Sequence, residues 1–91
     1  MKNRSFVEII AAILGVSSRG ARRTQIQYGA NLNHDQTKQY INRLLSSEMM
    51  LERKPLFFTT VKGNDFLLSF EQFSTVQQKY LKLKGVVEPS L

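Results

Sequence analysis

The stretch that decides the fold is TQIQYGANLNHDQTKQYINRLL, residues 24–45. It consists of two segments of helical character on either side of a four-residue joint, residues 30–33. Thr24 is a favoured N-cap residue and predicts that the first helix runs over about residues 24–30. Asn33 is followed three residues later by Gln36, the spacing of a capping box, which predicts a second helix from about residue 34. The stretch therefore predicts two helices joined by a tight turn.

The second of these helices, expected over residues 34–47, is amphipathic. At 100° per residue, the following side chains lie on one side of the helix: Thr37, Tyr40, Ile41, Leu44 and Leu45. The opposite side is rich in amides and bases and carries Asp35, Gln36, Gln39, Asn42, Arg43 and Ser46, flanked by His34 and Lys38. A helix that only has to be soluble more often carries Glu paired with Lys. This face indicates contact with a polar, negatively charged partner. Asp35 is expected to cap its own helix, and Tyr28 and Tyr40 are expected to belong to the core.

An amphipathic helix precedes this pair. Ser5 and Glu8 have capping-box spacing, and the apolar residues that follow share one face: Phe6, Ile9, Ile10, Ile13 and Leu14. Because Glu8 interrupts the apolar run, we interpret the segment as a core helix and not as a signal peptide or a membrane span.

A small hairpin follows the pair. Residues 50–52 and 56–60 have the composition of two short strands, and residues 53–55 form a basic turn between them. Pro55 cannot donate a ladder hydrogen bond, which suits a turn or a sheet edge.

The last predicted element is a long helix over about residues 61–84. Its apolar side chains follow the alternating spacing of a coiled-coil seam. The residues expected at a dimer interface are Phe66, Phe70, Phe73, Val76, Gln77, Tyr80 and Leu83. A helix of this length spans roughly 36 Å, longer than the small core is wide, so its second half would leave aromatic side chains in water. The same helix of a second copy can bury them. The alternatives are a helix folded back on its own domain and a frayed helix end.

Charge and composition narrow the partners. The chain has 91 residues, no Cys, one His and a net charge of +6. Residues 19–62 hold eight bases and three acids, whereas residues 63–91 hold three of each, so the positive charge is concentrated in the middle. This distribution favours nucleic acid over an anionic membrane or an acidic protein. A disulfide or thiolate metal site is impossible without Cys, and a single His makes no zinc site by itself.

The order helix, helix, turn, helix, hairpin, helix is that of a winged helix-turn-helix. The chain also resembles the small archaeal winged-helix DNA-binding proteins over about residues 4–83. The resemblance rests on GARRTQI (20–26), YGANL (28–32), YINRLL (40–45) and TVKGNDFL (60–67). It implies a chromatin-type protein or a transcription regulator that dimerises through antiparallel pairing of its last helices. Two departures from the family pattern are Glu48, in the segment where a glycine usually ends the recognition helix, and Thr59, where an apolar residue is more usual.

The expected fold is therefore mainly α with a small β-hairpin, a winged helix-turn-helix plus a long C-terminal antiparallel coiled-coil helix. We expect a DNA-binding domain over residues 1–65, a dimerisation helix over 61–85 in the same unit, and a flexible tail over 86–91.

The expected DNA contacts follow from helix-turn-helix geometry, in which the second helix lies in the major groove. We expect His34, Gln36 and Gln39 to contact base edges, because Gln and Asn amides can form two hydrogen bonds with adenine. We expect Lys38, Asn42 and Arg43 on the same helix to contact phosphates. Further phosphate contacts are expected from Thr24 and Gln25 at a helix N-terminus and from Arg22, Arg23, Arg53 and Lys54 around it.

The predicted function is that of a dimeric double-stranded DNA-binding protein that regulates transcription, with residues 34–47 in the major groove. The alternatives are a chromatin-organising protein without sequence preference and a winged-helix module that binds protein. No paired-carboxylate, Ser/His/Asp or phosphate-loop pattern occurs, so no enzyme, cofactor or metal is expected. We expect no membrane association and a cytoplasmic, nucleoid-associated location.

Overall fold

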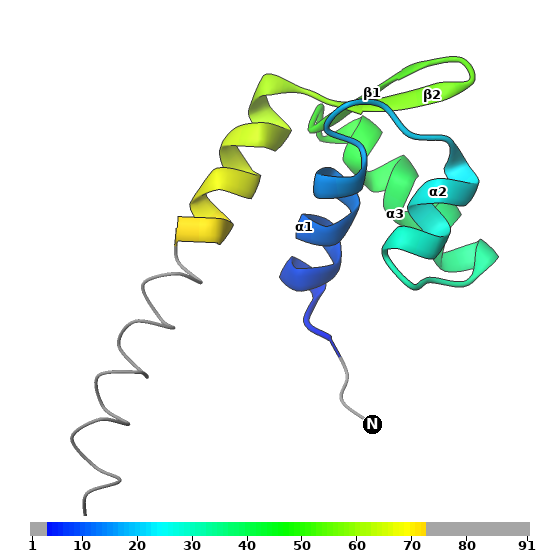
Figure 1. The fold of residues 1–91 in the computed structure, drawn as a ribbon, viewed down its shortest axis with the longest axis horizontal. Helices are drawn as coiled ribbons and strands as arrows, with labels where there is room; N and C mark the ends of the chain where they lie inside the picture. Colours follow the sequence, from blue (N-terminus) through cyan, green and yellow to red (C-terminus); the bar gives the residue numbers. More distant parts are fainter. Residues whose placement is uncertain (1–3, 73–91) are drawn as a thin grey trace, which may run out of the picture.

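The computed structural model of the chain describes residues 4–72. In chain order the elements are α1 (Phe6–Val16), α2 (Arg23–Gly29), α3 (His34–Ser46), β1 (Met50–Arg53) and β2 (Leu56–Thr59), and residues 61–72 form a further helix (Figure 1). This order is the predicted one. The prediction of a mainly helical chain with a small antiparallel hairpin is confirmed, and the ends of α2, α3, β1 and β2 lie within about one residue of those expected.

Two helices start at the capping boxes expected from the sequence. At α1, the Glu8 backbone N–H donates to Ser5 Oγ over 3.1 Å, and the Ser5 N–H donates to Glu8 Oε1 over 2.8 Å. At α3, the Gln36 N–H donates to Asn33 Oδ1 over 2.7 Å and the Asn33 N–H donates to Gln36 Oε1 over 3.1 Å. Each pair satisfies donors that a helix start leaves without partners, which fixes where the helix begins.

Two other cap predictions were wrong. Thr24 is not the N-cap of α2, because the helix already begins at Arg23 and its N-cap is Arg22. The start is held instead by Gln25, whose Oε1 accepts from the Arg22 N–H over 2.7 Å. Asp35 does not cap α3 because it is the second residue of the helix, behind the cap residue Asn33. Its carboxylate still lies in the first turn, where the helix dipole favours negative charge.

Both helices of the pair end in the same way. The Leu32 N–H donates to the Gln27 carbonyl and the Met49 N–H donates to the Leu44 carbonyl, the long bonds of two Schellman motifs. The residue before each donor has a positive φ, 55° at Asn31 and 65° at Glu48. Glu48 therefore supplies the left-handed conformation for which glycine is usual, and α3 still ends at the point that the fold requires.

The hairpin pairs Met50 with Thr59 and Arg53 with Leu56 in antiparallel register. The connector between α1 and α2 adds to it: Ala21 and Phe57 exchange backbone hydrogen bonds of 2.9 and 2.8 Å. This bridge was not predicted, because a basic connector with a single small apolar residue lacks the alternating pattern of a strand. The bridge fixes α2 relative to the hairpin.

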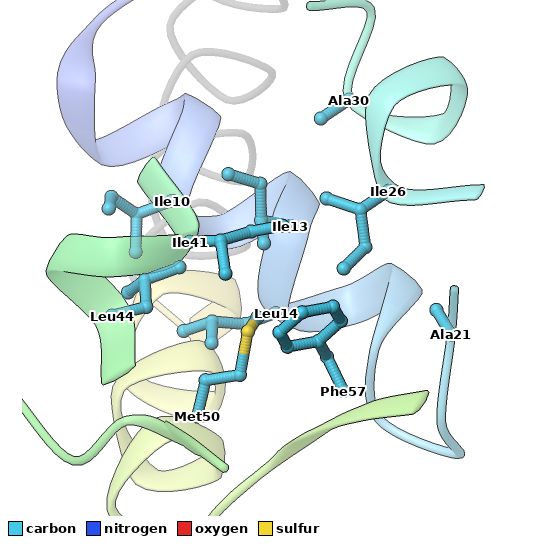
Figure 2. Close-up of a cluster of buried hydrophobic side chains, with 10 residues drawn as sticks. All are labelled: Ile10, Ile13, Leu14, Ala21, Ile26, Ala30, Ile41, Leu44, Met50 and Phe57. Atoms are coloured by element: carbon cyan, nitrogen blue, oxygen red, sulfur yellow. The ribbon is translucent and has the colours of Figure 1, made fainter. Parts of the chain in front are cut away.

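The core lies where α1, α2, α3 and the hairpin meet (Figure 2). Four of its side chains are fully buried, with 0% of their surface exposed: Ile13, Leu14, Ile26 and Ile41. Phe6 departs from the expected apolar face of the first helix and is 47% exposed. It is the first residue of α1, beyond the end of the core, and its ring packs against Tyr40 at a centroid distance of 5.8 Å.

The helix over residues 61–72 docks on this core. Thr60 caps it, because Thr60 Oγ1 accepts from the Gly63 N–H and donates to the Glu48 carbonyl. Gly63 is buried, and Phe66 and Leu67 pack against the core cluster. Among the residues expected at a coiled-coil interface, Phe66 and Phe70 are described. Phe73, Val76, Gln77, Tyr80 and Leu83 lie outside the described residues, so the coiled coil stays a prediction.

Candidate nucleic-acid interface

The outer face of α3 is a continuous polar surface. All eight side chains predicted to form or flank it are exposed: His34, Asp35, Gln36, Lys38, Asn42, Gln39, Arg43 and Ser46. The opposite face carries the buried Thr37, Ile41 and Leu44. Counting 100° per residue, Asp35, Ser46 and Gln39 lie in the middle of the exposed arc, with Asn42 on one side and Arg43 on the other. A major groove of B-DNA is wide enough to admit an α-helix that presents such a face.

Hydrogen bonds within the chain decide which amides of this face remain available. Gln36 Oε1 already accepts from the Asn33 N–H, so its side chain keeps only N–H donors for a partner. Gln39 and Asn42 make no side-chain hydrogen bond within residues 4–72. A bidentate contact with adenine requires one donor and one acceptor on the same amide. Gln39 therefore meets that requirement at the centre of the face, whereas Gln36 does not unless its cap opens.

Arg43 lies at the edge of the face and not at its centre. Its guanidinium carbon is 4.7 Å from the centroid of the Phe6 ring, a cation–π contact with α1. Lys38 is exposed on the other edge. If the helix lay in a groove, cations on its two edges would face the two phosphate backbones. The phosphate roles of Arg43 and Lys38 stay predictions.

The start of α2 brings four predicted contact residues together. Arg22, Thr24 and Gln25 are exposed, and Arg23 is half-buried because its guanidinium lies 5.7 Å from the centroid of the Phe57 ring. Gln25 Oε1 is held by the Arg22 N–H. Its side chain, like that of Gln36, keeps only donors for a partner. Hydrogen-bond donors and cations are the groups that bind phosphate oxygens.

The hairpin carries the last two predicted contacts. Arg53 ends β1 and Lys54 follows it in the turn, and both side chains are exposed. Thr59, at the other end of β2, has a structural role: its Oγ1 donates to the Leu14 carbonyl over 2.7 Å. That carbonyl lies in the last turn of α1, where carbonyl groups lack a hydrogen-bond partner within the helix. The hydroxyl at this unusual position thus joins the hairpin to α1.

Tyr28 was assigned to the core, and this was wrong: its side chain is 81% exposed. It follows the buried Ile26 by two residues, about 200° around the helix axis, so the two side chains point to opposite sides of α2. Helical spacing within this short segment could have identified it. Tyr40 is partly buried and packs against the core cluster, as expected.

Much of the positive charge of these surfaces is not paired with an acid inside the described part of the chain. Within residues 4–72, Arg22, Lys38, Arg53 and Lys54 form no ion pair. The described residues also hold no cluster of three or more His, Cys, Asp or Glu side chains that could bind a metal. In the same part of the chain, no helix combines the length and apolar character that crossing a bilayer demands. A polyanion is the partner that this charge distribution favours.

Comparison with known proteins places this geometry in a family. No curated protein sequence matches the chain. Among solved structures it is similar to the crystal structure of Sso10a-2, a DNA-binding protein from Sulfolobus solfataricus, with a TM-score of 0.77, 22% identity and 97% of each chain covered. At that identity the likeness concerns the fold alone. A family model described as winged helix-turn-helix matches residues 3–78. Since that match spans most of the sequence, the chain belongs to the winged helix-turn-helix family.

Proposed function

We propose that the chain is a dimeric protein that binds double-stranded DNA through α3 in the major groove and regulates transcription. The observation that carries the proposal is the exposed face of α3. Amides and cations lie around Gln39 on this face, and its one acidic residue is Asp35. The description of Sso10a-2 as a DNA-binding protein supports the same reading for a chain of similar fold.

In this proposal each exposed group has a role that its chemistry allows. Gln39 contacts a base edge at the centre of the groove, and His34 and the donors of Gln36 contact the groove near the start of α3. Cations and donors at the edges hold the phosphates: Arg22, Arg23, Thr24, Gln25, Lys38, Asn42, Arg43, Arg53 and Lys54. A location at the nucleoid follows from such a partner.

Dimerisation is the second half of the proposal. We assign it to a helix over residues 61–85, with a DNA-binding domain over residues 1–65. Leu68 supports an apolar contact surface on this helix, because it is 47% exposed. Two copies would present two α3 helices to successive turns of one duplex, about 34 Å apart. Sedimentation equilibrium of the chain and of a Tyr80→Glu variant tests this. We expect the parent chain to be a dimer and the variant to be a monomer, because the glutamate would place a charge in the proposed interface.

The experiment that tests DNA binding is a titration of a labelled duplex at two salt concentrations. A dimer that neutralises about six to ten phosphates should lose about 10³–10⁵ in affinity between 50 and 200 mM salt. Absence of binding at the lower salt concentration would refute the proposal and favour a module that binds protein.

A chromatin-organising protein without sequence preference is the second candidate, and one observation favours it. The oxygens of Gln25 and Gln36 are committed to helix caps, which leaves few complete amides for reading bases. Competition of the labelled duplex with unrelated DNA separates the two functions. A specificity ratio of roughly 10³ or more indicates a regulator, and a ratio near one indicates a packaging protein. Gln39→Ala should change sequence preference only in the first case.

A further inference from the structure

An apolar cavity of about 250 Å³ lies where α1, the end of α3 and the helix over residues 61–72 meet. Its apolar walls come from all three: Phe6, Val7, Ile10, Leu44, Met49 and Phe66. Ile10 and Leu44 lie at the same end of the core (Figure 2). Phe6 and Val7 are 47% and 43% exposed, so apolar surface remains open at the cavity and would gain free energy when covered.

The cavity has one charged wall, and it is positive. Arg43 lines it with its guanidinium over the Phe6 ring, and no acidic residue lines it. Arg43 has no ion-pair partner within residues 4–72. The other polar group, the Ser47 hydroxyl, donates to the Arg43 carbonyl over 2.9 Å and so already has an acceptor. Arg43 is therefore the group that would receive an anion, and its planar fork suits a carboxylate.

The volume and the walls define the ligand class. An apolar cavity of about 150 Å³ accommodates benzene, so this one has room for a single ring with a carboxylate substituent. A ligand without charge would leave Arg43 unpaired. A highly polar ligand would bury its polar groups against apolar walls without hydrogen bonds, which is costly.

We propose that this cavity binds a single-ring aromatic carboxylate, with the ring between the apolar side chains and the carboxylate on the Arg43 guanidinium. Because Arg43 also lies at the edge of the α3 face, a carboxylate bound to it competes with a DNA phosphate. This second part rests on the proposed function. Occupation of the cavity then lowers the affinity for DNA.

The binding site is tested by titrating the full chain with benzoate and with benzamide, its neutral isostere, and following backbone amide shifts by NMR. We expect saturable shifts at Val7, Ile10 and Leu44. Benzamide should bind about tenfold or more weakly, and Arg43→Gln should weaken benzoate by about the same factor without affecting benzamide. Arg19→Gln removes an exposed guanidinium outside the cavity and should change neither affinity. Equal affinities for the two ligands, unchanged benzoate binding by Arg43→Gln, or no saturable shifts would overturn the site.

The effect on DNA is tested by fluorescence anisotropy of a labelled duplex with saturating benzoate. Sodium chloride keeps the ionic strength constant, since salt alone weakens such binding. We expect weaker duplex binding with benzoate than with benzamide, and unchanged binding would overturn the competition. The two proposals fail separately. A chain that binds benzoate through Arg43 but no duplex refutes the proposed function only. A chain that binds the duplex but no benzoate refutes the cavity only.

Discussion

Replacing Gly63 by Ala tests how the last helix is seated. Gly63 lies inside the helix over residues 61–72, where helix propensity alone predicts that Ala stabilises the protein by about 1 kcal/mol. The tertiary structure predicts the opposite sign. A Cβ at this position would lie 2.1 Å from the Met49 carbonyl oxygen and 2.8 Å from Thr59 Cγ2.

The magnitude follows from what can move. The Met49 carbonyl cannot withdraw freely, because it accepts the Thr60 N–H over 3.0 Å. Overpacking costs about 1–3 kcal/mol, and contact with backbone that is held in place belongs at the upper end. After the gain of about 1 kcal/mol in helix propensity, the net loss is about 2 kcal/mol. For a chain of this size, that lowers the melting temperature by roughly 8–16 °C.

The assay is thermal and urea unfolding followed by circular dichroism, with Gly15→Ala as the matched control. Gly15 also lies inside a helix, α1, and a Cβ there meets no atom within 4 Å. We therefore expect Gly15→Ala to raise stability by about 1 kcal/mol. If Gly63→Ala proves as stable as the parent chain while the control behaves as expected, the helix does not sit against Met49 and the reasoning is refuted.

Three further substitutions test single contacts by urea unfolding. Thr59→Val removes the hydrogen bond to the Leu14 carbonyl and should lower the free energy of unfolding by about 1–2 kcal/mol; an unchanged midpoint would show that the bond contributes nothing. Glu48→Gly should raise it by about 0.5–1 kcal/mol, because φ at this position is 65°, and a loss would contradict the strain argument. Ser17→Ala should leave it unchanged or raise it by up to about 1 kcal/mol, because the buried hydroxyl finds no hydrogen-bond partner in the described part of the chain; clear destabilisation would reveal a partner.

Much of the candidate site could be predicted because its determinants are local. The exposed face of α3 follows from helical periodicity, and its start follows from the Asn33–Gln36 cap, a contact over three residues. The capping-box spacing also indicates that the Gln36 side chain reaches back to the Asn33 N–H, and the structure contains that bond. The sequence alone does not show that Gln39, on the same face, makes no side-chain hydrogen bond within residues 4–72.

The sequence by itself determined the order of the elements, two of the helix starts and the side of α3 that faces outward. These features depend on interactions between residues three or four positions apart, and the geometry of a helix brings such residues together whatever the rest of the chain does. Tertiary structure alone decided the bridge between Ala21 and Phe57, the position of Arg43 over Phe6 and the space that Gly63 must leave for Met49. Each of these joins residues far apart in the chain. Which distant residues meet depends on how the whole core packs, because neither partner has a local preference for the other.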